Sequence, residues 1–557
     1  MWPCVNSGGG HPTVTRFPQN LLKSRKAIEN PNIFSPLLAT PTFLPLAGDV
    51  NQERRDLLPV RRSIILPGML PRVEIRSRDC PAFRTGMAIA RAILVLAGIL
   101  VFAWPERGWS LDRAQATELC RAYLVRGDKS ERQQIVKQLA EYQGPIQPIV
   151  DRLAAGSYAK VEPGYHPEEH FSTPDLRKKH SSDLLYFVVP KEYRPDRPTG
   201  LIVFLHGGGK TTSPRAPQAT LRFPDRNASS HASGDMFAAT GMITVGPSSP
   251  NKPSYHRWCL EEADDYLTDV ILECKRRFNI DTNRVFLLGH SMGGFGAYHH
   301  ALRQPDRFAA VVVNSGSWNM AYWPALRGTP LCIVNGLHDA HQDTGDGKGH
   351  RWHYTDVQYG RLTDQILARR QLDHVYLEHD GGHGFSFGRK YVFEYFRSAR
   401  DLRRDPFFDH VGLASPAGFR EAYCYPVQHN RWLSLNEAVK GSLEYDELIE
   451  HYSIEHGMRN FASWRLEYRQ GKHRGALLDA VNRHDNTIVV STRNVARFTV
   501  WLHPRMVDVS RPVTIMVDGK IGFQGRITPS LVTMLESYER RYDWGLVYPM
   551  KVVVDLR

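Results

Sequence analysis

The sequence predicts an α/β fold: a mainly parallel sheet with helices on both faces, preceded by a small helical segment and followed by a mixed, β-rich C-terminal region. Continuous apolar runs such as 201–205 and 285–288 alternate with amphipathic stretches. This pattern is typical of strands that are buried on both faces and alternate with the helices that cover them. After residue 482 the pattern changes to short β-branched runs, and Asp518-Gly519 between two of them is a hairpin turn signal. We therefore expect more than one core.

Length and composition agree with several globular units. The chain has 557 residues, of which 42% are hydrophobic and 23% charged, whereas a single core usually takes about 100 to 200 residues. The 71 basic and 58 acidic residues give a net charge of +13. Residues 1–86 contain 12 basic and 6 acidic residues, so the rest of the chain has 59 basic and 52 acidic residues and a net charge of +7. No basic run is interleaved with aromatic residues, so we expect no nucleic-acid partner.

A secretory signal peptide is indicated at residues 87–110. Met87 and Arg91 begin a short basic start, and an apolar run from Ala92 to Trp104 follows it. This run is shorter than the ~20 residues needed to span a bilayer, so no stable transmembrane helix is expected. The interpretation predicts a secreted or periplasmic protein. Residues 1–86 are then an extension that is either non-native, through a misassigned start codon, or disordered.

The remaining chain divides into four parts. We expect a helical segment at 111–170, the α/β domain at 171–405, a connector with short helices at 406–482 and a β-rich domain at 483–557. In the α/β domain, strands are predicted at 201–205, 242–245, 284–288, 309–313, 331–334 and 375–377. In the last domain they are predicted at 487–492, 497–502, 513–517 and 551–556. A helix at 263–274 should bury its apolar stripe and expose Asp264, Asp265, Thr268, Asp269 and Glu273.

The cysteines do not suggest a metal or dithiol site. None has C-x-x-C spacing, and an odd number follows the predicted signal peptide. Buried free thiols are expected, with at most two disulfides as the alternative. The cysteines concerned are Cys120, Cys259, Cys274, Cys332 and Cys424.

The motif that carries chemistry is Gly-His-Ser-Met-Gly-Gly at 289–294. G-x-S-x-G alone is a weak signal, but here a buried strand precedes it and a helix at 295–302 follows it. This is the strand, sharp turn and helix that a nucleophilic serine requires. Ser291 is therefore the predicted nucleophile.

An oxyanion-binding loop is predicted at His206-Gly-Gly-Gly, directly after the strand at 201–205. Glycines let backbone N–H groups approach a reacting carbonyl oxygen closely. The expected donors are the amides near Gly208, Gly209 and Met292.

A serine needs a base, and the base needs a carboxylate that orients it. Asp339 follows the strand at 331–334, and His383 follows the strand at 375–377, so both lie at carboxyl ends of strands. Ser291, Asp339 and His383 form the predicted triad. Asp343 remains an alternative acid, and His379 an alternative base.

Two further groups near the expected site have alternative roles. The loop after Asp339 is rich in histidine and aspartate, and we interpret it as solvated or substrate-facing; no metal site is predicted. Its residues are His341, Asp343, Asp346, His350 and His353. Trp258, Trp318 and Trp323 either pack in the core or line an acyl pocket.

The stretch 278–294, with the upstream HGGG loop and the downstream Gly-x-x-Asp and Gly-His, is similar to a known family. It resembles secreted α/β-hydrolases grouped with polyhydroxybutyrate depolymerase-like and feruloyl-type esterases and with prolyl-oligopeptidase-like catalytic domains. The resemblance covers roughly residues 185–400. It implies the α/β-hydrolase fold and a serine hydrolase that needs no cofactor and acts on a small-molecule or polymeric ester. A serine peptidase and a non-catalytic binding protein are the alternatives.

Overall fold

The computed structural model describes residues 111–125, 127–209, 212–250, 256–339, 355–416, 426–454 and 461–557. The chain divides into two compact units, Met1–Trp109 and Ser110–Arg557, and every described residue belongs to the second. The predicted extension at 1–86 and signal peptide at 87–110 lie outside the described residues. Within those ranges, no helix combines the length and the apolar character needed to cross a membrane.

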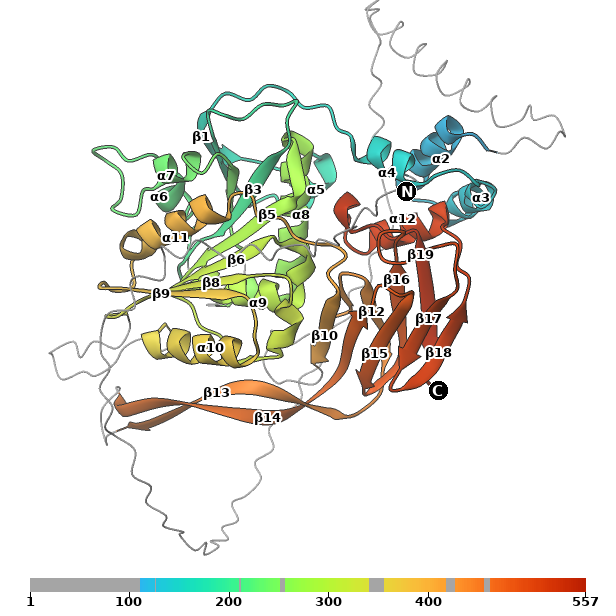
Figure 1. Ribbon diagram of the computed structural model, residues 1–557. Coiled ribbons are helices and arrows are strands. Elements are labelled where there is room, and N and C mark those ends of the chain that lie inside the picture. Colours follow the sequence, from blue (N-terminus) through green and yellow to red (C-terminus); the bar gives the residue numbers. More distant parts are fainter. Residues whose placement is uncertain are drawn as a thin grey trace, which may run out of the picture. The chain divides into compact units, whose positions relative to one another are not determined.

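The α/β domain contains an eight-stranded sheet with the order β1-β2-β4-β3-β5-β6-β8-β9 (Figure 1). Its strands are β1 (Gly164–Glu169), β2 (Leu185–Val189), β3 (Thr199–Leu205), β4 (Ile243–Pro247), β5 (Ile280–His290), β6 (Ala310–Asn314), β8 (Leu331–Gly336) and β9 (His374–His379). β2 runs antiparallel to both of its neighbours, and the strands from β4 to β9 are parallel. This is the α/β-hydrolase fold, and each predicted strand of the domain is present.

Helices cover both faces of this sheet, as predicted. Along β3, Leu201, Val203 and Leu205 contribute to one buried cluster, whereas Ile202 and Phe204 contribute to another. The first cluster packs under α8 (Glu261–Arg277), α9 (Met292–Arg303) and α10 (Val357–Arg369). The second packs under α6 (Gln218–Leu221), α7 (Gly234–Ala238) and α11 (Phe385–Ala399). Alternate burial of side chains explains why the strand reads as a continuous apolar run.

The water-facing side predicted for α8 is wrong at Glu273. This side chain is fully buried. Its carboxylate accepts hydrogen bonds from Arg277 Nε at 2.6 Å and from the backbone N–H of Ser172 at 2.8 Å. This charged residue next to the apolar stripe can be buried because Arg277 of the same helix and Ser172 from outside it satisfy its carboxylate.

The prediction of short helices at 406–482 is also wrong. The described residues of this range form strands instead: β10 (His410–Pro416), β11 (His429–Asn430), β12 (Leu433–Ala438), β13 (Ser442–Ile454) and β14 (Phe461–Asn482). β13 is rich in Glu, Leu and other helix-compatible residues, but it pairs with β14 along its whole length. Cross-strand ion pairs such as Glu447 with Arg469, at 2.8 Å, stabilise this ribbon. Tertiary pairing therefore overrides local propensity.

The predicted strands of the C-terminal domain are present, in two sheets. They are β15 (Thr487–Arg493), β16 (Val495–Leu502), β17 (Val513–Val517), β18 (Lys520–Gly525) and β19 (Met550–Asp555). One sheet has the order β18-β17-β15-β14-β13-β7, where β7 is Met320–Ala321, and β10 lies beside β14. The other sheet has the order β11-β12-β16-β19. Asp518 and Gly519, with φ of 48° and 81°, form the predicted turn between β17 and β18.

Two contacts of this domain were not predicted. The β13–β14 ribbon lies along α10 of the α/β domain (Figure 1), and Arg370 Nη2 contacts Asp446 Oδ1 at 2.8 Å. β7 (Met320–Ala321), from the α/β domain, pairs with β13.

The helical segment at the start of the described chain contains α2 (Arg113–Val125), α3 (Lys129–Leu139) and α4 (Gln147–Ala154). These helices share an apolar cluster with α12 (Leu531–Glu539), and Arg132 pairs with Glu539. The helical part ends before the predicted boundary at 170, because β1 already pairs with β2 of the main sheet.

The four described cysteines, Cys120, Cys259, Cys274 and Cys332, are buried. Cys120, Cys274 and Cys332 are free thiols, as the free-thiol interpretation predicts. Cys424 lies outside the described residues.

A buried ionic cluster joins the α/β domain to the C-terminal domain. Asp543 Oδ1 lies 2.9 Å from Arg404 Nη2, and Asp543 Oδ2 lies 3.1 Å from Lys275 Nζ. Burial raises the pKa of Asp543, but Arg404 and Lys275 lower it more, so the pKa lies well below its usual value. A depressed pKa means that this carboxylate stabilises the fold above its unfolded-state pKa of about 4, and that the contribution is lost as the pH falls below that value.

We expect Asp543→Asn to lower the free energy of unfolding at pH 7 by about 3 to 5 kcal/mol, because it removes the carboxylate that pairs with the buried Arg404 and the half-buried Lys275. Urea unfolding at pH 7 and at pH 3 to 5 measures this, and the variant should lose less stability on acidification than the wild type. Asp555→Asn is the control, because its partner Arg497 is exposed; we expect a change below about 1 kcal/mol. Equal losses in the two variants would contradict the prediction.

Candidate active site

Ser291 occupies a sharp turn between β5 and α9. Its backbone has φ 57° and ψ −120°, a strained conformation for a residue with a side chain. The flanking glycines make the turn possible: a Cβ at Gly289 would clash with the carbonyl oxygen of Gly293, and a Cβ at Gly293 would clash with that of Leu205. The turn therefore presents the Ser291 hydroxyl at the carboxyl edge of the sheet and at the N-terminus of α9.

The structure brings Ser291, His383 and Asp339 together. His383 Nε2 lies 2.7 Å from Ser291 Oγ, and His383 Nδ1 lies 2.9 Å and 3.1 Å from the two carboxylate oxygens of Asp339. The Asp339 side chain is 1% exposed and that of His383 is 45% exposed. The histidine can therefore meet a substrate, while the aspartate is shielded from water.

Backbone hydrogen bonds between the loops after β8 and β9 fix this arrangement. The N–H of Leu337 donates to the carbonyl of His379, and the N–H of His338 donates to that of Gly381. Neighbouring parallel strands end at the same edge, so residues 44 positions apart in the sequence come into contact.

The alternative base, His379, has a different environment. It is buried at the end of β9 and stacks on Tyr391, with ring centroids 6.1 Å apart. Its ring nitrogens have no hydrogen-bond partner among the described residues. The alternative acid, Asp343, and the histidines of its loop lie outside the described residues.

The loop after β3 lies against Ser291. A Cβ at Gly207 would lie 3.0 Å from Ser291 Cβ, and Gly208 has φ 146°, which favours glycine. The N–H of Gly209 donates to Thr212 Oγ1 at 2.5 Å, so this predicted oxyanion donor has a protein partner in the structure. Met292 begins α9, immediately after Ser291.

Two side chains hold this loop in a role that the sequence did not indicate. Trp258 Nε1 donates to the carbonyl of His206 at 3.1 Å, and Arg257 Nη2 donates to that of Gly209 at 3.1 Å. Trp258 and Trp323 are buried, so the core-packing interpretation applies to both. Trp258, one of the three candidates for lining an acyl pocket, is thus a hydrogen-bond partner of the predicted oxyanion loop.

His290 and His206, which lie near Ser291 and His383, are neutral at physiological pH. Burial lowers the pKa of His290 to about 3, although Nδ1 contacts Asn314 Oδ1 at 2.7 Å. Burial likewise lowers the pKa of His206 to about 4. The His290 ring centroid is 5.3 Å from that of His383, so a neutral His290 adds no positive charge beside the base.

Thr355 is the residue of the site that sequence analysis missed. It is buried, and its Oγ1 donates a 2.8 Å hydrogen bond to Asp339 Oδ1. It stands next to Asp356, the N-cap of α10. A helix that follows a parallel strand begins at the carboxyl edge of the sheet, where the site lies. A threonine just before such a helix was therefore the signal in the sequence for a residue near Asp339.

We expect Thr355→Val to lower kcat for ester hydrolysis about tenfold to a hundredfold, because a hydrogen bond to a charged group is worth about 1.5 to 3 kcal/mol. Thr355→Ser keeps the hydroxyl and should restore at least half of the wild-type rate. Steady-state kinetics with unchanged circular dichroism measures this. A kcat that is higher in Thr355→Val than in Thr355→Ser would contradict this prediction.

Comparison with known proteins agrees with this geometry. Residues 184–344 match the family model “Esterase”, described as “Putative esterase”. That segment contains Ser291 and Asp339 and precedes His383. The resemblance to esterases seen in the sequence is therefore confirmed for this segment.

One curated relative is the bifunctional acetylxylan esterase/xylanase XynS20E of Neocallimastix patriciarum, which is 26% identical over 157 residues. The match covers 28% of this chain and 21% of that protein, so the chain spans about a fifth of the relative's length.

Similar solved structures include a ferulic acid esterase, 15% identical, with a TM-score of 0.32 over 43% of this chain and 98% of that one. Another is a thermophilic esterase from Thermogutta terrifontis, 15% identical, with a TM-score of 0.31 over 42% of this chain and 92% of that one. Because these TM-scores are low, the fold assignment rests on the strand order of the eight-stranded sheet.

Proposed function

We propose that this protein is a serine hydrolase that cleaves carboxylic ester bonds through a covalent acyl-enzyme. The observation that carries the proposal is the hydrogen-bonded chain from Ser291 Oγ through His383 to the buried Asp339. A serine hydroxyl is a weak nucleophile until a base takes its proton, and this chain supplies the base and its orienting carboxylate.

In the proposed reaction His383 Nε2 accepts the Ser291 proton as Oγ attacks the ester carbonyl carbon. Asp339 stabilises the imidazolium that forms and holds its Nδ1–H. His383 then donates the proton to the leaving alkoxide, and the alcohol departs. Water, deprotonated by the same histidine, attacks the acyl carbonyl carbon. The bond from that carbon to Ser291 Oγ then breaks as His383 returns the proton to Oγ, and the acid is released. These steps require no cofactor.

The negative charge on the tetrahedral intermediate needs backbone donors. The Met292 N–H lies next to the nucleophile at the start of α9, where the helix dipole also favours an anion. Gly208 and Gly209 are the second group of candidates, and Gly209 would have to exchange its contact with Thr212 for the substrate oxyanion.

The substrate class can be tested with chromogenic compounds. The curated relative is an acetylxylan esterase/xylanase, so acetyl esters are the first candidates. We expect p-nitrophenyl acetate and butyrate to be hydrolysed and peptide p-nitroanilides to remain intact. Preferential cleavage of the anilides would favour the peptidase alternative, and cleavage of neither would favour a binding protein.

We further propose that the protein is exported, on the basis of the basic start and apolar run at 87–104. The expected mature N-terminus lies between about Ala103 and Leu111. N-terminal sequencing of the protein isolated from its native host measures this. Peptides from residues 1–86 in a proteome digest would contradict it.

A further inference from the structure

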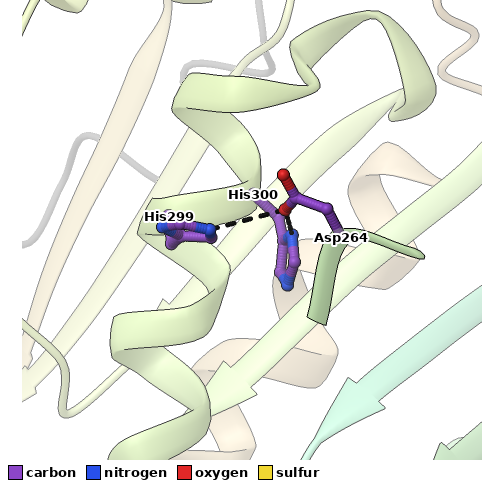
Figure 2. Close-up of side chains that lie close together, drawn as sticks. All are labelled: Asp264, His299 and His300. Atoms are coloured by element: carbon purple, nitrogen blue, oxygen red, sulfur yellow. Dashed lines mark ion pairs between the residues drawn. The ribbon is translucent and has the colours of Figure 1, made fainter. Parts of the chain in front are cut away.

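Three metal-ligand side chains converge away from the triad, between α8 and α9. Asp264 of α8 faces His299 and His300 of α9 (Figure 2). Asp264 Oδ1 lies 3.4 Å from His299 Nε2 and 3.2 Å from His300 Nδ1. The histidines are 1% and 0% exposed and the Asp264 side chain is 17% exposed, although sequence analysis placed this aspartate on the water-facing side of the helix.

The contact between Asp264 and His300 does not satisfy the polar atoms that make it. Asp264 Oδ1 and both ring nitrogens of His300 are buried without a hydrogen-bond partner among the described residues. A buried polar atom without a partner costs about 1 to 3 kcal/mol, and more if it is charged. Asp264 Oδ1 and His300 Nδ1 are thus 3.2 Å apart without the geometry of a hydrogen bond.

The spacing of these atoms fits a shared metal ion. Zinc binds histidine nitrogen and carboxylate oxygen at about 2.0 to 2.2 Å, so two ligand atoms of a tetrahedral site are separated by about 3.3 to 3.5 Å. The separations of 3.2 and 3.4 Å match an edge of such a tetrahedron, and all three ligand atoms lie within 4.8 Å of one another.

We propose that Asp264, His299 and His300 form a zinc site that cross-links α8 and α9. Arg303 Nε donates to Asp264 Oδ2 at 2.8 Å, which leaves Oδ1 as the single carboxylate ligand and orients it. The positive charge of Arg303 should make binding weaker than at a site with cysteine ligands. His299 and Arg303 also line a cavity of about 60 Å³, which is large enough to hold water beside His299.

The site is structural rather than catalytic. His299 lies eight residues after Ser291 along α9, about 12 Å at 1.5 Å per residue. The ion would fix the helix that carries the nucleophile against its neighbour. The inference is therefore independent of the proposed esterase activity.

Metal binding by the tag-free full chain tests the proposal. Protein stripped with a chelator is titrated with Zn²⁺ alone, desalted and analysed for metal content; a second sample receives Co²⁺ alone. We expect one zinc per chain in the wild type and the strong visible absorption of tetrahedral Co²⁺. His300→Gln should retain less than about a tenth of the wild-type zinc, because a three-ligand protein site loses one of its ligands.

His374→Gln is the matched control, since His374 pairs with Asp364 at 3.0 Å elsewhere in the fold and its loss should leave zinc binding unchanged. If His300→Gln is unfolded by circular dichroism, Asp264→Asn and the wild-type Co²⁺ spectrum give the answer. A wild type that retains no zinc, a six-coordinate Co²⁺ spectrum, or undiminished binding by folded His300→Gln would overturn the proposal. Ester hydrolysis by the same samples reports separately on the proposed function.

Discussion

Ser291→Ala is expected to lower kcat for ester hydrolysis by about 10³ to 10⁶ while the protein remains folded. The substitution removes the atom that forms the acyl-enzyme, and alanine fits the same turn without a new contact. Steady-state kinetics on a p-nitrophenyl ester, with circular dichroism and thermal unfolding of the same preparation, measures both parts of this expectation.

Ser398→Ala is the control for this variant. Ser398 lies near the end of α11, and its hydroxyl donates to the carbonyl of Tyr395 at 2.8 Å, so its loss should leave kcat unchanged. Retention by Ser291→Ala of more than about a tenth of the wild-type kcat, far above the residual rate of a triad lacking its nucleophile, would exclude Ser291 as the nucleophile.

Asp339→Asn should be nearly inactive, with kcat lowered by about 10⁴. The amide would present either an N–H or a neutral oxygen to His383 Nδ1, so it would lose the charge that stabilises the imidazolium and the fixed tautomer. Asp339 contacts both His383 and Thr355 and is buried, so no other carboxylate can easily replace it. Kinetics at pH 7 and 8 on folded protein measures the effect.

Asp343→Asn is the natural comparison, because Asp343 is the alternative acid on sequence grounds. We expect its kcat to stay within about tenfold of the wild type, since a loop carboxylate outside the triad contributes little beyond exposed electrostatics. The reverse ranking of the two variants would mean that the acid has been assigned to the wrong residue, although Ser291 and His383 would keep their roles.

The parts of the fold that were predicted correctly depend on local patterns. The runs at 201–205 and 331–334 read as buried strands because each is apolar on both faces, and β3 and β8 begin and end close to those bounds. The turn at Ser291 was predictable for a similar reason: its glycines are required by contacts with immediate neighbours in the chain and with one adjacent strand.

The parts that were missed depend on contacts between distant segments. β13 has helix-compatible residues, and only its pairing with β14 and its contact with α10 decide its structure. Glu273 and Asp264 look exposed on a helical wheel, but partners from other segments bury them. Thr355 reaches Asp339 across 16 residues, and its bond depends on where α10 begins.

Labelling with a fluorophosphonate probe tests the central claim most directly, because the probe phosphonylates only a serine whose hydroxyl is activated by a neighbouring base. We expect peptide mass spectrometry to find one adduct per chain, on Ser291, and prior incubation with an ester substrate to slow its formation. Folded protein that acquires no adduct on Ser291, or acquires it equally fast in the Asp339→Asn variant, would contradict the assignment of Ser291, His383 and Asp339 as a catalytic triad.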